Sequence, residues 1–156
     1  MNHSLTRLVV KLFCVTFSGI IFYLPGNPAQ ALSPPLSSEQ LEKDSDLIVE
    51  GEALESIRCM EKVESNRCSD VYRYEIPVVI RRVLKGKFKA GEKITVSYLH
   101  YDYGKSDCVG DQGPVILPGQ EGLFYLRSQS EKVYDAFHWS AVKTTRPGAG
   151  FLPKCR

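Results

Sequence analysis

The sequence predicts an all-β fold with a short helix before its first strand. Apolar and polar residues alternate along several short runs, which is the period-two pattern of half-buried strands, and almost no run has helical periodicity. Turn-forming residues such as Pro118-Gly119 separate these runs at short intervals. Five predicted strands in one small domain favour an antiparallel barrel or a sandwich.

Residues 1–31 have the pattern of a removable secretory signal. A basic start with Arg7 and Lys11 precedes an apolar run over 12–24, and Ala29-Gln30-Ala31 offers the small residues after which signal peptidases cut. The apolar run is about 13 residues long, whereas a membrane-spanning helix needs roughly 20, so cleavage is favoured over a retained anchor. We therefore expect a secreted or periplasmic protein, cleaved after Ala31, with no stable membrane anchor after cleavage.

Cleavage would leave a domain with balanced charge. The whole chain has 20 Lys and Arg residues and 18 Asp and Glu residues, and the signal holds two of the basic residues and none of the acidic ones. Residues 32–156 are then close to neutral, and they lack the positive field of a dedicated nucleic-acid binder. No nucleic-acid partner is expected.

The cysteines predict two disulfides. Of the five cysteines in the chain, Cys14 would leave with the signal, and an even number in a small exported domain indicates a disulfide framework. Among the three connectivities that four cysteines allow, we expect a local Cys59–Cys68 bond. The second bond, Cys108–Cys155, would then fix the C-terminal tail.

The lead-in, residues 32–45, is expected to hold one short helix. Ser37 precedes Gln40 by the spacing of a capping box, which predicts a helix over Ser38–Asp44. The domain itself is expected over residues 46–145. Its first strand is residues 46–54, where Gly51 indicates a bulge or a bend.

Residues 71–84 have the clearest strand pattern in the chain. Apolar residues from Tyr72 to Ile80 fall on one face, and charged residues such as Arg73 and Arg81 fall on the other. Pro77 cannot donate to a ladder, so this strand is expected to be at an edge, bulged or bent there. A long strand with a bend suits a small barrel in which one strand serves both sides.

Three further strands and a tail complete the prediction. Residues 93–99 and 121–127 alternate apolar and polar positions. Residues 133–142 form the fifth predicted strand, in which Trp139, the only tryptophan, is expected to anchor the core. Residues 146–156 are rich in Pro and Gly and are expected to form a tail held by a disulfide at Cys155.

Three motifs in a fixed order link the domain to a known superfamily. They are residues 45–51 (SDLIVEG), residues 72–76 (YRYEI) running into 83–86 (VLKG), and residues 117–121 (LPGQE) before 123–126 (LFYL). Over residues 46–127 the chain resembles the netrin-module and tissue-inhibitor-of-metalloproteinases superfamily, in its uncharacterised exported bacterial branch. The resemblance implies a small five-stranded antiparallel OB-like barrel, here crosslinked by two disulfides.

The start of the expected mature chain departs from that superfamily. Its eukaryotic inhibitors begin with a Cys-x-Cys pair, whose free amine and carbonyl chelate the zinc of the protease. Here the mature chain would begin Leu32-Ser33-Pro34, and its first cysteine is Cys59. The resemblance therefore implies the fold without implying metalloproteinase inhibition.

A basic turn is the first candidate contact region. It places five cations within nine residues, and no acidic residue lies between Ile76 and Gly91. The cations are Arg81, Arg82, Lys85, Lys87 and Lys89. Such a turn could bind a polyanionic glycan, an anionic lipid or an acidic partner, but it is more typical of a solvated hairpin whose lysines discourage edge pairing.

The aromatic and polar loop after residues 93–99 is the second candidate contact region. His100, Tyr101 and Tyr103 follow Tyr98 there, and tyrosines supply contact area for protein or sugar recognition, although they also pack at the mouth of a barrel. The same loop holds acidic side chains beside His100 and Cys108. They are Asp102, Asp107 and Asp111. Their spacing matches neither the zinc nor the calcium pattern, so an ordinary polar loop is favoured over a metal site.

These observations predict an exported binding module rather than an enzyme. No catalytic residue, metal or cofactor is expected, and the partner would be an extracellular protein or a glycan. Its contact surface is expected to combine the loop 100–113 with the basic turn 81–89. One alternative is a small secreted hydrolase or metal-dependent enzyme with a site around His100, in which Cys108 would be the candidate nucleophile. Another is a protease inhibitor whose inhibitory segment differs from the eukaryotic one.

Overall fold

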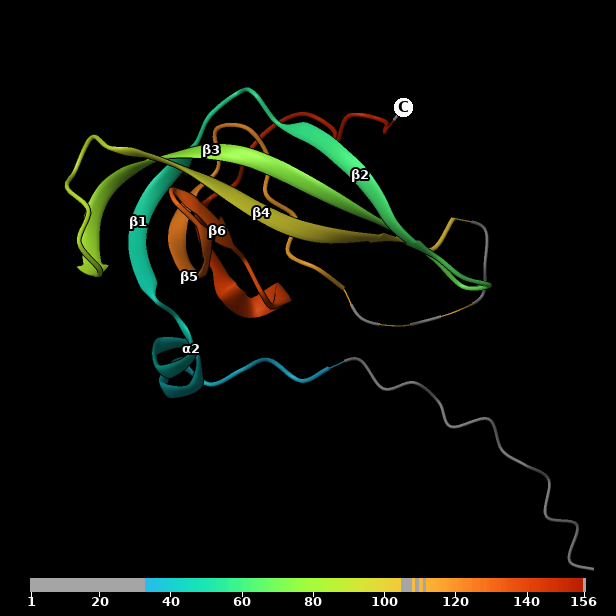
Figure 1. The fold of residues 1–156 in the computed structure, drawn as a ribbon, viewed down its shortest axis with the longest axis horizontal. Coiled ribbons are helices and arrows are strands. Elements are labelled where there is room, and N and C mark those ends of the chain that lie inside the picture. Colours follow the sequence, from blue (N-terminus) through green and yellow to red (C-terminus); the bar gives the residue numbers. More distant parts are fainter. Residues whose placement is uncertain (1–32, 105–107, 109, 111, 156) are drawn as a thin grey trace, which may run out of the picture.

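The computed structural model describes residues 33–104, 108, 110 and 112–155, so the expected signal and its cut site lie outside the described residues. The chain is mostly β, as predicted, with one α-helix ahead of a single sheet (Figure 1). The helix is α2 (Ser38–Asp44). The strands are β1 (Leu47–Ala53), β2 (Arg58–Ser65), β3 (Asp70–Lys85), β4 (Lys93–Asp102), β5 (Glu121–Ser130), β6 (Val133–Asp135) and β7 (Val142–Arg146). A 3-10 turn, η1 (Trp139–Ala141), precedes β7.

Helix α2 begins where the capping box predicts. Ser37 Oγ accepts a hydrogen bond from Gln40 N at 3.2 Å, and Gln40 Oε1 accepts one from Ser37 N at 2.9 Å. The buried side chain of Leu41 then packs against Ile48 and Tyr125. The helix therefore covers one end of the sheet, next to the start of β1 (Figure 1).

The strand pairings close into a cycle. β1 pairs antiparallel with β3 and with β5, β3 pairs with β4, β4 pairs in parallel with β6, and β6 pairs with β5. β2 joins the cycle only through β3, and β7 only through β5, among the described residues. The long strands bury one common hydrophobic cluster, to which Val49, Ile76, Val96 and Phe124 each contribute a fully buried side chain.

The long strand β3 changes partners at Pro77. Its first part pairs with β2 as far as Glu75, and its second part pairs with β1 from Val78 onward. The carbonyl of Pro77 faces the gap between these ladders and accepts a hydrogen bond from Leu54 N at 2.8 Å. Since N–H and C=O of one residue in an antiparallel strand point to the same side, no ladder bond to β4 is lost at this proline.

Two parts of the predicted strand pattern are wrong. β2 is an additional strand, and the predicted strand 133–142 divides at Ala136 into β6, η1 and β7. The His138 side chain accepts a hydrogen bond from Ser140 N at 3.1 Å and caps η1. Such a local side-chain bond to the backbone competes with a strand ladder. Trp139 is consequently 38% exposed and does not anchor the core.

The four cysteines among the described residues all form disulfides, but the predicted pairing is wrong. The bonds are Cys59–Cys155 and Cys68–Cys108, with Cα atoms 5.2 Å and 5.4 Å apart. The reason is β2, because Cys59 lies near its start and Cys68 lies in the turn after its end. About nine extended residues span roughly 30 Å, which is beyond the reach of a disulfide. The tail is held at Cys155 as expected, although by a different partner.

Candidate functional site

The structure does not bring the two predicted contact regions together. The basic turn lies at one end of the β3–β4 hairpin, and His100 lies near the other end, where it pairs with Tyr72 (Figure 1). Tyr72 and Lys85 are about 13 residues apart on β3, which corresponds to roughly 40 Å of strand. One contact surface cannot include both regions, so each is described separately.

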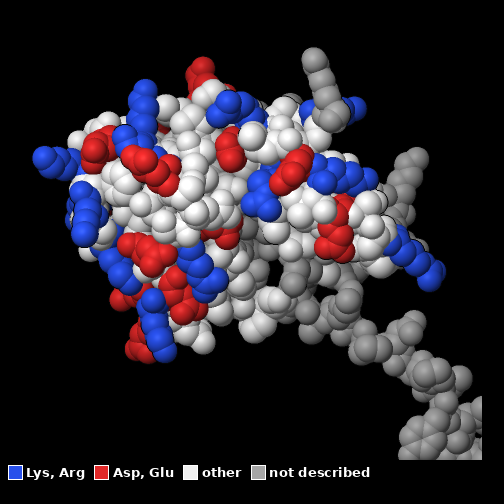
Figure 2. All heavy atoms as spheres, in the orientation of Figure 1, with Lys and Arg blue, Asp and Glu red and all other residues white. Residues whose placement is uncertain are grey.

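Most cations of the basic turn already have partners. Arg81 pairs with Glu52, Arg82 pairs with Glu50, and the Lys85 ammonium donates a hydrogen bond to a helix carbonyl at 2.8 Å. Within the described part of the chain, Lys87 and Lys89 have no ion pair. Figure 2 shows acidic and basic side chains mixed over the visible face, without a broad area of one sign. The turn therefore offers little unpaired positive charge.

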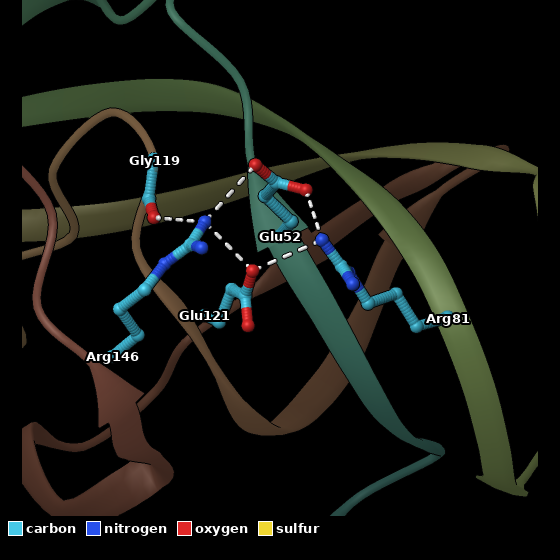
Figure 3. Close-up of polar contacts among 5 residues, drawn as sticks. All are labelled: Glu52, Arg81, Gly119, Glu121 and Arg146. Atoms are coloured by element: carbon cyan, nitrogen blue, oxygen red, sulfur yellow. Dashed lines mark hydrogen bonds and ion pairs between the residues drawn. The ribbon is translucent and has the colours of Figure 1, made fainter.

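Arg81 belongs to a closed ring of four ion-paired side chains from four strands (Figure 3). It contacts Glu52 at 2.6 Å and Glu121 at 3.0 Å, and Arg146 contacts the same two carboxylates at 3.4 Å and 2.7 Å. The hydrogen bond from Arg81 lowers the pKa of Glu52. The ring links β1, β3, β5 and β7. Each of its two arginines pairs with both of its carboxylates, so the ring leaves no unpaired charge for a ligand.

The aromatic loop divides over two faces of β4. Strand side chains alternate, and His100 lies on the same side as Tyr98, with its ring 6.0 Å from that of Tyr74. Burial lowers the pKa of the His100 imidazole, and Asp102 opposes this shift. Tyr101 lies on the opposite face, and Tyr103 packs near Gly110. Of the predicted loop residues, Tyr101 lines a small pocket on its face of β4.

The geometry around His100 does not support the alternative of a hydrolase or metal-dependent enzyme. In the described segments no group of three His, Cys, Asp or Glu side chains could hold a metal ion. Asp107 and Asp111 lie outside the described residues. Cys108 is bonded to Cys68, so it offers no thiol as a nucleophile.

A small pocket lies on the Tyr101 face of β4, and we call it the aromatic pocket. Its volume is about 120 Å³. β4 contributes Leu99 and Tyr101, and the chain before β5 contributes residues 112–114. The last residue of β6 and the chain after it contribute residues 135–139, and Ser33 closes one side. Four segments far apart in the sequence thus meet at one site.

Close backbone packing and one hydrogen bond fix the walls of the aromatic pocket. A Cβ atom added at Gly113 would lie 1.6 Å from the carbonyl oxygen of Leu99, so only glycine lets this segment approach β4. On the other side, Trp139 Nε1 donates a hydrogen bond to the carbonyl of Ser33 at 3.0 Å. The indole N–H is therefore satisfied, while the ring itself stays partly exposed to solvent.

Two polar groups in the aromatic pocket could contact a ligand. The His138 imidazole lies with its Nδ1 3.1 Å from Ser140 N, from which it accepts a hydrogen bond, and 2.7 Å from Ser140 Oγ. Asp135 supplies a half-buried carboxylate. Burial raises the pKa of Asp135, and the charges of Arg73 and Arg127 partly offset that rise.

Sequence reasoning missed Asp135, Phe137 and His138 because it placed them in a strand, and it placed Trp139 in the core. In the run DAFHW, Phe137 and Trp139 are two residues apart, so a period-two pattern places both on one face together with Asp135. The alternation therefore gave no local sign that this run leaves the ladder after Asp135. The pocket as a whole also depends on Gly113 and Ser33, which only the fold brings to it.

The aromatic pocket provides ring faces, a carboxylate and an imidazole, a combination of groups that suits ligand binding. Comparison with family models, with curated proteins and with solved structures gives no match to this chain. In the part of the chain that the structure describes, none of the helices has both the length and the apolar character of a membrane span. A functional assignment therefore depends on the geometry of the pocket.

Proposed function

We propose that this protein is an exported binding module that recognises its ligand in the aromatic pocket. The observation that carries the proposal is the position of Trp139, a residue that is 38% exposed and lines the same pocket as Tyr101 and the half-buried Asp135. Covering a partly exposed aromatic ring contributes favourable energy, and aromatic residues dominate the contacts that matter most in binding sites. The carboxylate would then select the ligand.

The proposal includes an OB-like barrel related to the netrin and metalloproteinase-inhibitor superfamily. The cycle β1–β3–β4–β6–β5 supports this architecture, because it has one parallel contact and one long strand, β3, that changes partner from β2 to β1 along one edge. OB folds bind ligands on the face of their second and third strands and on the loops beside them. The aromatic pocket takes Leu99 and Tyr101 from β4, the third strand of this cycle.

Export with cleavage after Ala31 is also part of the proposal. Two disulfides are compatible with an extracellular or periplasmic protein, and residues 1–31 have the composition of a secretory signal. Amino-terminal sequencing of the protein recovered from outside the cytoplasm tests this part. A chain that begins at Leu32 would support export with cleavage, and a chain that retains residues 1–31 would contradict it.

Binding in the aromatic pocket can be tested with the single tryptophan as a reporter. The mature protein with both disulfides is titrated with short peptides and with oligosaccharides of different charge, while Trp139 fluorescence and amide chemical shifts are recorded. A ligand should shift the amides of residues 99–101 and 135–139 together. Tyr101→Ala should weaken binding, whereas Phe151→Ala, which removes an aromatic ring that is 93% exposed outside the pocket, should not. A ligand that shifts only residues 85–89 would contradict the proposed site.

A further inference from the structure

Residues 33–36 (Ser-Pro-Pro-Leu) lie against the turn η1, and we call them the strap. A hydrogen bond holds the strap at each end. Trp139 Nε1 donates to the carbonyl of Ser33 at 3.0 Å, and Leu36 N donates to Ser140 Oγ at 3.2 Å. Ser33 also forms one wall of the aromatic pocket. The domain therefore already binds an extended segment of its own chain beside Trp139.

The strap fits a polyproline II segment. Ser33 and Pro34 each precede a proline, which favours extended backbone, and the proline rings fix φ of Pro34 and Pro35 near about −65°. Ser37, the next residue, has φ −64° and ψ 158°. In polyproline II every third residue faces the same side. The two end residues of the strap are accordingly half-buried, and the two prolines between them are exposed.

The groups that hold the strap are common to proline-rich extended segments. One carbonyl and the N–H three residues later bond to η1, and the prolines between them have no N–H to satisfy. The side chain of Leu36 packs against the apolar cluster of Leu41, Ile48, Tyr125 and Ala141. Another segment with two prolines before an aliphatic residue can make the same two hydrogen bonds and the same apolar contact.

The strap can open without unfolding the domain. The capping box of Ser37 and Gln40 and a 2.9 Å hydrogen bond from Lys143 to Ser38 Oγ hold the start of α2, so opening can pivot at Ser37. The proposed cleavage would leave one residue, Leu32, ahead of the strap. Chain ends with little buried apolar surface open at a small part of the free energy of global unfolding.

Resting on the binding function proposed above, we infer that the site at Trp139 and η1 binds a proline-rich extended segment of an extracellular protein partner, in competition with the strap. The partner segment would take the position of residues 33–36. Aromatic-lined sites bind polyproline II segments because the preformed helix loses little entropy on binding. The strap would lower the apparent affinity for the partner by the fraction of molecules in which it is open.

A second copy of this chain is a poorer source of the segment than a separate partner. The strap has four residues, and polyproline II rises about 3.1 Å per residue, so the strap reaches about 12 Å from its pivot. Two copies that exchanged straps would need both η1 turns within that reach at once. A segment of a separate protein has no such limit.

The test compares two blocked peptides on the full mature protein with both disulfides. One is acetyl-Ser-Pro-Pro-Leu-Ser-amide, and the other has glycines in place of the two prolines. The indole N–H resonance of Trp139, the only tryptophan in the chain, and the amides of residues 139–141 report binding. The proline peptide should bind about tenfold more tightly, because glycine loses more backbone freedom at both positions. Equal binding of the two peptides would overturn the inference.

A looser strap should raise the apparent affinity for the proline peptide. Pro34→Gly combined with Pro35→Gly changes two exposed residues and makes closure of the strap entropically more costly. The Kd of the peptide should fall about tenfold, and hydrogen exchange of the Trp139 indole N–H should accelerate by the same factor. Pro147→Gly, at an exposed proline outside the strap, should change neither quantity. An unchanged Kd in the strap variant would mean that peptide and strap do not share a site, and the inference would fail.

Three outcomes distinguish this inference from the binding function on which it rests. If an oligosaccharide shifts the amides of residues 99–101 and 135–139 and the proline peptide does not, the binding function stands and the inference is wrong. If no probe of any class shifts them, both are wrong. If the mature protein is a dimer that excess peptide dissociates, the strap of a second copy is the occupant, and the inference of a separate partner is wrong.

Discussion

Removing the Cys59–Cys155 disulfide should cause the largest loss of stability that a single bond in this protein can cause. The two residues are 96 positions apart, and the chain-entropy relation gives about 4.7 kcal/mol for a loop of that length. The Cys68–Cys108 bond closes a separation of 40, which gives about 3.9 kcal/mol. At a urea m-value of about 2 kcal/mol/M, either loss lowers the unfolding midpoint by roughly 2 M.

Single substitutions can also identify which cysteines are paired. Cys59→Ser and Cys155→Ser break the same bond, so after alkylation of the free thiol both variants should unfold at the same urea concentration. Cys68→Ser and Cys108→Ser should form a second matching pair. Urea unfolding followed by far-UV circular dichroism measures all four midpoints. If Cys59→Ser matched Cys68→Ser instead, the local pairing would be correct and the reasoning from the 96-residue separation would be refuted.

Three further perturbations test the core, the aromatic pocket and its charge. Tyr98→Phe removes the buried hydrogen bond that the phenol donates to Ile116 O at 2.9 Å. It should lower the free energy of unfolding, measured by urea titration, by about 1 kcal/mol. An unchanged free energy of unfolding would contradict a role for that bond. Gly113→Ala places a Cβ atom 1.6 Å from Leu99 O, so it should lower the unfolding midpoint and change Trp139 fluorescence in the folded state; a variant identical to the parent in both would refute the close approach. Burial raises the pKa of Asp135, so the folded state binds the proton of this carboxyl more tightly than the unfolded state does. Ionising Asp135 therefore costs stability as the pH rises from the ordinary carboxyl range through the raised pKa. Asp135→Asn should be more stable than the parent at pH 7 and should lose that advantage near about pH 4. The same difference in urea midpoint between variant and parent at both pH values would contradict this prediction.

Local sequence features predicted the parts of this fold that depend on neighbours in the chain. Ser37 and Gln40 determine the start of α2 through a reciprocal pair of bonds three residues apart, so the helix is correct at both ends. The apolar alternation of β3 and β4 reflects one buried face, and it places both strands. These features need no knowledge of which strand pairs with which.

The missed parts depend on contacts between distant segments. β2 exposes nearly all its side chains, so no apolar alternation marks it. Its ladder with β3, ion pairs with β3 such as Arg73–Glu61 and the bond at Cys59 hold it in place. The disulfide prediction failed for the same reason, since it treated residues 59–68 as a loop. Trp139 was placed in the core because of its size, whereas the His138 cap turns the chain away from the ladder. The aromatic pocket followed from none of these local patterns, because four separate segments build it.

The disulfide connectivity also bears on how such a chain matures if it crosses a membrane amino-terminus first. Cysteines joined in their order of emergence would give Cys59 with Cys68, and later Cys108 with Cys155, and neither bond exists in the folded protein. Cys59 instead has to wait for Cys155, which follows it 96 positions later. The native arrangement therefore requires either delayed oxidation or thiol–disulfide exchange through mixed intermediates, a slow process without an isomerase. If the chain is exported, the compartment that receives it should accordingly contain a disulfide isomerase as well as an oxidant.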